Sequence, residues 1–136
     1  MKDKELYILY ALNTEFPEAD IKEDKFIYNR YDAYSKKTII EIKDRNIFYE
    51  NTMIEFDKFS YNLLYAQMSK KQFIYVVKMD QKIYVFNITK LVSSGYKFKW
   101  IFKELKKQTE FADKRKIKKL VGYININESV KEIYAK

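Results

Sequence analysis

Two carboxylates and a lysine, Asp32, Glu41 and Lys43, have the residue types and spacing of a metal-dependent hydrolytic site. Carboxylate oxygens are the ligands that hard cations prefer, and Mg²⁺ holds them at about 2.0–2.1 Å. A lysine beside such a cation can orient water and stabilise negative charge on a phosphate. The set therefore suggests phosphodiester hydrolysis, provided that the fold brings the three side chains together.

A hairpin is the element that would bring them together. Residues 37–44 read as a strand because β-branched residues cluster there and Glu41 alternates with isoleucines. Residues 25–34 read as its partner. A turn about residues 36–37 places Asp32 opposite Glu41, where cross-strand Cβ atoms lie about 5 Å apart. A slip of one residue would put the two carboxylates on opposite faces of the sheet.

The acid-x-Lys triplet is not specific on its own, because lysine is abundant in this chain. The triplet occurs five times. Only the occurrence at residues 41–43 combines an apolar strand, an upstream aspartate on a pairing strand and a preceding helix. The alternative interpretation is a ladder of ion pairs on an exposed sheet face.

The composition limits the chemistry. A chain of 136 residues with 47% apolar residues fits one domain with one core. The absence of Cys and His excludes zinc fingers, disulfides and Cys–His or Ser–His nucleophiles. With 2 Gly and 1 Pro, the chain has no Gly-rich nucleotide loop.

The net charge of +8 is unevenly distributed. Residues 97–119 hold ten basic and three acidic residues, which predicts a segment that binds a polyanion. The alternative is that the lysine content reflects an AT-rich genome. The residues expected to contact backbone phosphates without sequence preference are Lys114, Arg115, Lys116, Lys118 and Lys119.

The N-terminal residues are unlike a signal peptide, and no run approaches the roughly 18 apolar residues of a membrane span. We therefore expect a cytoplasmic protein with no membrane partner.

The remaining patterns predict further helices and strands. Tyr96, Phe98 and Trp100 alternate with lysines, which predicts a strand with one aromatic face, and Trp100 could either join the core or stack on a base. Residues 113–123 fit either a basic helix or a loop that runs into a last strand. The other expected elements are helices over 5–12 and 53–69, strands over 73–79 and 82–88, and a helix from Asn127 to Tyr134. The order predicts an α+β or mixed α/β domain over residues 1–136, with a basic segment at about 96–120.

The chain resembles the PD-(D/E)xK nuclease superfamily, specifically its small phage-type members and Holliday-junction resolvase relatives. Glu5 in the first helix, Asp32 on a strand and Glu41-Ile42-Lys43 on the next strand stand in the order of that family. The resemblance covers about residues 4–90. It implies a restriction-endonuclease-like mixed sheet flanked by helices, and Mg²⁺- or Mn²⁺-dependent cleavage of DNA.

Two features depart from the family pattern. Tyr31 stands where the motif has proline. The family core usually has three strands before its second helix, whereas two are evident here. Either residues 26–30 and 32–34 are separate strands, or residues 19–22 supply the third.

The resemblance assigns roles to several side chains. Asp32 and Glu41 would bind the metal with the carbonyl of Ile42, and Lys43 would orient the attacking water. Glu5 would contact a second metal or its water. Arg45 and Lys58 would contact DNA phosphates, although each also fits a solvated side chain.

The leading hypothesis is an endodeoxyribonuclease with a preference for DNA structure, and the resolvase relatives suggest a homodimer. The alternative is a non-catalytic nucleic-acid-binding or viral accessory protein that retains the nuclease fold. A third interpretation is a host-interaction protein whose aromatic face is the interface.

Overall fold

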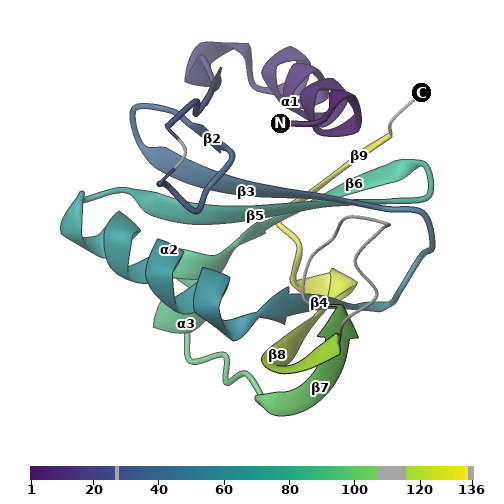
Figure 1. Cartoon of the computed structure of the whole chain (residues 1–136). Helices are drawn as coiled ribbons and strands as arrows, with labels where there is room; N and C mark the ends of the chain where they lie inside the picture. The colour runs from purple at the N-terminus through teal and green to yellow at the C-terminus, as the bar shows by residue number, and fades with distance from the viewer. Residues whose placement is uncertain (27, 107–115, 135–136) are drawn as a thin grey trace.

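A six-stranded mixed sheet and a three-stranded antiparallel sheet organise the chain (Figure 1). The computed structural model describes residues 1–26, 28–106 and 116–134. The helical elements are α1 (Asp3–Glu15), the 3₁₀ turn η1 (Pro17–Ala19), α2 (Phe56–Met68), α3 (Ile88–Ser93) and the 3₁₀ turn η2 (Ile126–Glu128). The strands are β1 (Lys22–Glu23), β2 (Ala33–Tyr34), β3 (Thr38–Arg45), β4 (Asn51–Glu55), β5 (Gln72–Met79), β6 (Lys82–Asn87), β7 (Ile101–Lys106), β8 (Lys116–Asn125) and β9 (Lys131–Tyr134).

The larger sheet has the strand order β1-β2-β3-β5-β6-β9. Its central pair, β3 and β5, is parallel and is connected through α2, whereas its other pairs are antiparallel. Helix α1 covers one face, and α2, α3 and the smaller sheet lie against the other (Figure 1). The fold is therefore α+β, with a mixed sheet flanked by helices, as the sequence predicted.

The hairpin between β2 and β3 has the predicted register. Ala33 pairs with Ile40 and Tyr34 with Ile39, so Asp32, one residue before β2, comes opposite Glu41. The turn is closed by a hydrogen bond from the Ser35 N–H to the Thr38 carbonyl at 2.9 Å. The pairing extends over only two residues of the predicted first strand, and the extra strand before it is β1, at residues 22–23.

Apolar side chains of β3 enter cores on both faces of the larger sheet. Ile40 and Ile42 pack with Ile8 and Leu12 of α1. Ile39 instead joins the core beneath α2 and the smaller sheet. Because both faces are covered, the face that carries Glu41 and Lys43 is not the exposed ladder considered from the sequence.

The smaller sheet, with the order β4-β8-β7, was not expected as a separate unit. The helix predicted over 53–69 begins at Phe56, because residues 51–55 form β4 and pair with β8. Thr52 and Ile54 alternate inward on β4, and Ile54 packs in the core beneath α2. Burial gained through a distant strand outweighs the local helical preference.

Three further expectations for the C-terminal part need correction. The strand predicted from Tyr96 begins only at Ile101, although Tyr96, Phe98 and Trp100 do pack against the core beneath α2. The helix predicted from Asn127 is wrong, since η2 is followed by β9, which pairs with β6. Of the ambiguous residues 113–123, those from 116 onward lie in β8. Among the described residues, no helix is long and apolar enough to cross a membrane.

Candidate carboxylate and lysine site

Asp32 is held in place by three hydrogen bonds that span neighbouring segments. Its N–H donates to the Ile40 carbonyl at 2.8 Å, and its carbonyl accepts from the Asp24 N–H at 2.9 Å. Its Oδ2 accepts from the Ile42 N–H at 2.7 Å, so the side chain replaces a strand partner where β2 has not yet begun. The preceding loop is tied to α2, because the Asn62 amide donates to the Arg30 carbonyl at 3.2 Å. These bonds fix the carboxylate at the edge of β3.

Glu41 is almost completely buried, with 2% of its surface exposed. Two ammonium groups approach the same oxygen: Oε1 lies 3.3 Å from Lys58 Nζ and 3.9 Å from Lys43 Nζ. The other oxygen, Oε2, is buried and has no hydrogen-bond partner. A buried polar atom without a partner costs free energy, so this oxygen is open to a proton or a cation.

The environment of Glu41 disfavours its charged form. Burial raises the pKa of Glu41 to about 8, and the negative charge of Asp32 adds to the rise, while Lys58 and Lys43 oppose it. Burial also lowers the pKa of Lys43, and the neighbouring Lys58 ammonium adds to that fall. Burial alone would lower the pKa of Lys58, but the Glu41 carboxylate more than compensates and raises it. Coupled shifts of this kind are typical of sites that handle protons.

The candidate side chains line one cavity of about 530 Å³, which we call the carboxylate cavity. Glu5, itself half-buried, reaches it from the first turn of α1, and Ile42, Lys43 and Arg45 reach it from β3. The full lining is Lys2, Lys4, Glu5, Asp32, Glu41, Ile42, Lys43, Asp44, Arg45, Asn46 and Lys58. The structure therefore brings together the four residues predicted to be catalytic.

The backbone of β3 adds one possible oxygen ligand. The Ile40 carbonyl and the Ile42 N–H both point toward the β2 edge of β3, where they meet Asp32. Because N–H and C=O directions alternate along a strand, the Ile42 carbonyl points to this same edge, beyond the strand pairing of β2. Ligation of a metal by this carbonyl stays a prediction.

These groups fit Mg²⁺ or Mn²⁺ only as a partly hydrated ion. Among the described residues, no three Asp, Glu, His or Cys side chains form a cluster that could hold a metal. Mg²⁺ usually keeps several waters and binds protein through one or two carboxylates. The unpartnered Oε2 of Glu41 and the carboxylate of Asp32, whose charge acts on Glu41, are the two carboxylates that would hold such an ion, and the Ile42 carbonyl would be a third oxygen ligand.

The other residues predicted to bind DNA have different surroundings. Arg45 lines the carboxylate cavity and interacts with the Tyr75 hydroxyl. Lys58 is engaged with Glu41 and is not a freely solvated side chain. Lys119 is bound to Glu55 at 2.7 Å, whereas Lys118 is exposed on β8. Two of the expected phosphate contacts, Lys114 and Arg115, lie outside the described residues, as does the side chain of Lys116.

Trp100 has a core role. Its ring centroid lies 4.9 Å from those of Phe56 and Phe59 and 5.0 Å from that of Phe98. The ring is therefore partly buried against other aromatic rings, which favours the core role over stacking on a base.

Sequence reasoning missed the pairing of Lys58 with Glu41 and that of Glu55 with Lys119. Glu55 is the last residue of β4, and Lys58 lies in the first turn of α2, so both depend on the strand-to-helix junction that was not predicted. Burial raises the pKa of Glu55, but its bond to Lys119 outweighs burial and lowers it overall.

Comparison of the chain with protein-family models, curated proteins and solved structures gives no match.

Proposed function

We propose that the protein is a divalent-metal-dependent nuclease that hydrolyses DNA phosphodiester bonds at the carboxylate cavity. The observation that carries the proposal is the meeting of Asp32 and Glu41 beside two lysines, with one Glu41 oxygen buried and unpartnered. The resemblance of Glu5, Asp32 and Glu41-Ile42-Lys43 to the PD-(D/E)xK pattern supports it.

Asp32, Glu41 and the Ile42 carbonyl would hold Mg²⁺ or Mn²⁺. The bound ion would supply positive charge to a phosphate oxygen and lower the pKa of a bound water. The chain keeps these ligands in place before substrate arrives, because hydrogen bonds fix Asp32 and burial fixes Glu41. Such preorganisation reduces the cost of arranging charge during the reaction.

Lys43 and Lys58 would have different roles, one in proton transfer and one in charge stabilisation. The lowered pKa of Lys43 makes its amine available to accept a proton from the attacking water. The raised pKa of Lys58 keeps its ammonium charged, so it can stabilise negative charge that develops on the phosphate. The two neighbouring lysines with opposite pKa shifts thus suit a base and a charge-stabilising role.

The test is incubation of the purified protein with plasmid, single-stranded and branched DNA in Mg²⁺, Mn²⁺ or EDTA. We expect cleavage with either metal and none with EDTA. Asp32→Asn and Glu41→Gln should each abolish cleavage while DNA binding in EDTA is retained. Glu18→Gln, which removes an exposed carboxylate outside the cavity, is the matched control. Folded protein that cleaves none of these DNAs, or Asp32 and Glu41 variants that still cleave, would refute the proposal.

A second candidate function is DNA binding without catalysis. It is favoured by the contacts of Lys43 and Lys58 with Glu41, because two ammonium groups approach the buried carboxylate and the Lys58 contact joins α2 to β3. This alternative predicts salt-sensitive DNA binding, with log affinity falling linearly against log salt. It also predicts that Mg²⁺ neither changes that affinity nor stabilises the fold.

A further inference from the structure

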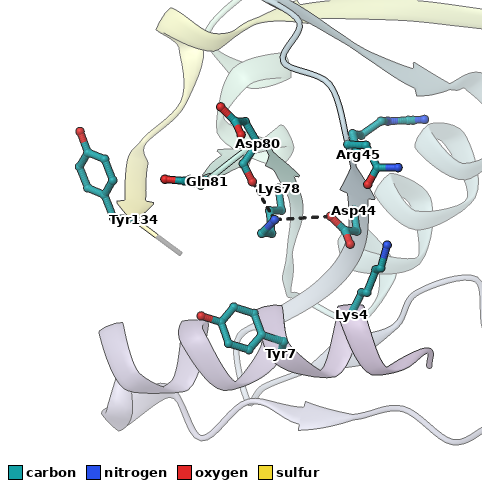
Figure 2. A pocket seen from close by; sticks show the side chains of 9 residues that line it. Lys4, Tyr7, Asp44, Arg45, Lys78, Asp80, Gln81 and Tyr134 are labelled. Carbon is teal, nitrogen blue, oxygen red and sulfur yellow. Dashed lines mark hydrogen bonds and ion pairs between the residues drawn. The ribbon is translucent and has the colours of Figure 1, made fainter. Parts of the chain in front are cut away.

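A second cavity opens beside the carboxylate cavity, and we call it the outer cavity. It has a volume of about 720 Å³ and lies between α1, the end of β3, the β5–β6 turn and β9 (Figure 2). Its lining residues are Lys4, Tyr7, Asp44, Arg45, Asn46, Lys78, Asp80, Gln81 and Tyr134. None of the roles assigned above explains why tyrosines, carboxamides and cations gather there.

The two cavities adjoin each other. They share Lys4, Asp44, Arg45 and Asn46 as lining residues. Along β3, Glu41 and Arg45 are four residues apart, which is about 13 Å at 3.3 Å per residue. Stacked nucleotides follow one another at about 3.4 Å along a strand. A nucleic acid strand of a few nucleotides therefore reaches from one cavity into the other.

The cations of the outer cavity are placed to meet a phosphate. Lys78 Nζ is held 3.9 Å from Asp44 Oδ1 and donates to the Asp80 carbonyl at 2.7 Å, so it has a fixed position in the cavity (Figure 2). Arg45 and Lys4 stand at the boundary with the carboxylate cavity. The outer cavity thus presents three cations and two carboxylates, and Lys4, Arg45 and Asp44 lie where it meets the carboxylate cavity.

The rest of the outer cavity suits a nucleobase. Tyr7 of α1 and Tyr134 of β9 both line the cavity, and Figure 2 shows their rings at its margin. Lys82 Nζ lies 4.9 Å from the centroid of the Tyr134 ring, but Tyr134 is 74% exposed, so much of the remaining ring surface is available to a ligand. Aromatic side chains of this kind stack on unpaired bases irrespective of sequence. The carboxamides of Asn46 and Gln81 supply donors and acceptors for the edge of a base.

We propose that the outer cavity binds an unpaired nucleotide of a DNA strand whose backbone continues through the carboxylate cavity. The inference takes its substrate class from the proposed function and narrows it to DNA with a single-stranded segment next to the scissile phosphate. An unpaired base is required, because the bases of a duplex are stacked on one another and are not available to tyrosine rings.

The first test measures binding in EDTA, so that it does not depend on cleavage. Fluorescence anisotropy would compare a short oligothymidylate with a blunt hairpin duplex of equal length. We expect Tyr134→Ala and Lys78→Gln each to weaken binding of the oligothymidylate roughly tenfold, as loss of one stacked base or one phosphate contact does. Binding of the duplex should change less than twofold in the Tyr134 variant. Tyr28→Ala removes an equally exposed ring that lines neither cavity and should leave both affinities unchanged.

The second test locates the base directly in the wild-type protein. An oligothymidylate carrying one 5-iododeoxyuridine would be crosslinked by light, and the attached peptide identified by mass spectrometry. Attachment to Tyr7 or Tyr134 supports the inference. Attachment only elsewhere, or unchanged oligothymidylate binding in both the Tyr134 and the Lys78 variant, would overturn it. If the protein crosslinks at these tyrosines but does not cleave DNA with Mg²⁺, the proposed nuclease function is refuted while the nucleotide-binding site in the outer cavity is supported.

Discussion

Replacing Glu41 by glutamine should change how the stability of the protein depends on pH. Glutamine has the shape of protonated glutamate but cannot ionise. In the wild-type protein, burial and the charge of Asp32 raise the pKa of Glu41 from 4.5 to about 8. The folded state therefore binds a proton that the unfolded state releases over this range, and folding stability falls as the pH rises.

The size of the effect follows from the same pKa values. A tenfold change in proton affinity is worth about 1.36 kcal/mol. Because the pKa of Glu41 is about 8 in the folded state instead of 4.5, ionising Glu41 destabilises the folded state by at most about 5 kcal/mol. The contribution of protonated Glu41 to folding stability is fully present below the unfolded pKa and is lost as the pH rises through about 8. The Glu41→Gln variant has no such loss, because its side chain does not titrate. We therefore expect Glu41→Gln to match wild type in acid and to exceed it in stability by several kcal/mol in mild alkali.

Urea unfolding in EDTA at about pH 5 and about pH 8.5 measures this difference, because these values bracket most of the titration. Glu55→Gln is the control, because the bond to Lys119 lowers the pKa of Glu55 instead of raising it. The stability contribution of Glu55 is present above its unfolded pKa and is lost only as the pH falls below that value, so the stability difference between wild type and Glu55→Gln should be nearly the same at both pH values. Adding Mg²⁺ at the higher pH should stabilise wild type but not Glu41→Gln, since a cation on the carboxylate replaces the lost proton. A constant stability difference between wild type and Glu41→Gln at both pH values would show that this reasoning is wrong.

Three further predictions concern the framework around the site. Gly122→Ala should cost about 1–3 kcal/mol in urea unfolding, because the added Cβ would lie 2.9 Å from the Trp100 ring; wild-type stability would contradict this packing. Asn62→Ala should lower the free energy of unfolding by roughly 1–3 kcal/mol, because the Arg30 carbonyl loses its hydrogen-bond donor, and it should also reduce DNA cleavage. If neither stability nor cleavage changes, the Asn62–Arg30 hydrogen bond does not hold this loop in place. A double-mutant cycle of Glu55→Gln with Lys119→Gln should give a coupling of about 1 kcal/mol, whereas additive effects would show that the 2.7 Å contact contributes nothing.

The register of the first hairpin could be predicted because its determinants are local. The alternation of Ile40, Glu41 and Ile42 and the turn before Thr38 lie within a few residues of one another. That information placed Asp32 opposite Glu41. Metal binding and catalysis by these residues stay predictions.

The burial of Glu41 could not be predicted in the same way. It depends on α2 and the smaller sheet, which cover a face that local alternation leaves polar. Residues 51–55 enter β4 because β8 offers backbone partners about seventy residues later. β9 likewise depends on pairing with β6, which competes successfully with the helix suggested by Asn127. In each case a distant partner decides between two locally acceptable conformations.

The pairing of β4 with β8 has a consequence for the synthesis of the chain. The contact between Asn51 and Asn125 closes a separation of 74 residues. Ribosomes add about 5–20 residues per second, so β4 leaves the ribosome roughly 4–15 s before the end of its partner. Until β8 has been synthesised, β4 has an unpaired edge. Such an edge is a template for association with other chains. Slower translation of residues 56–115 should therefore lengthen the period in which the nascent chain needs a chaperone.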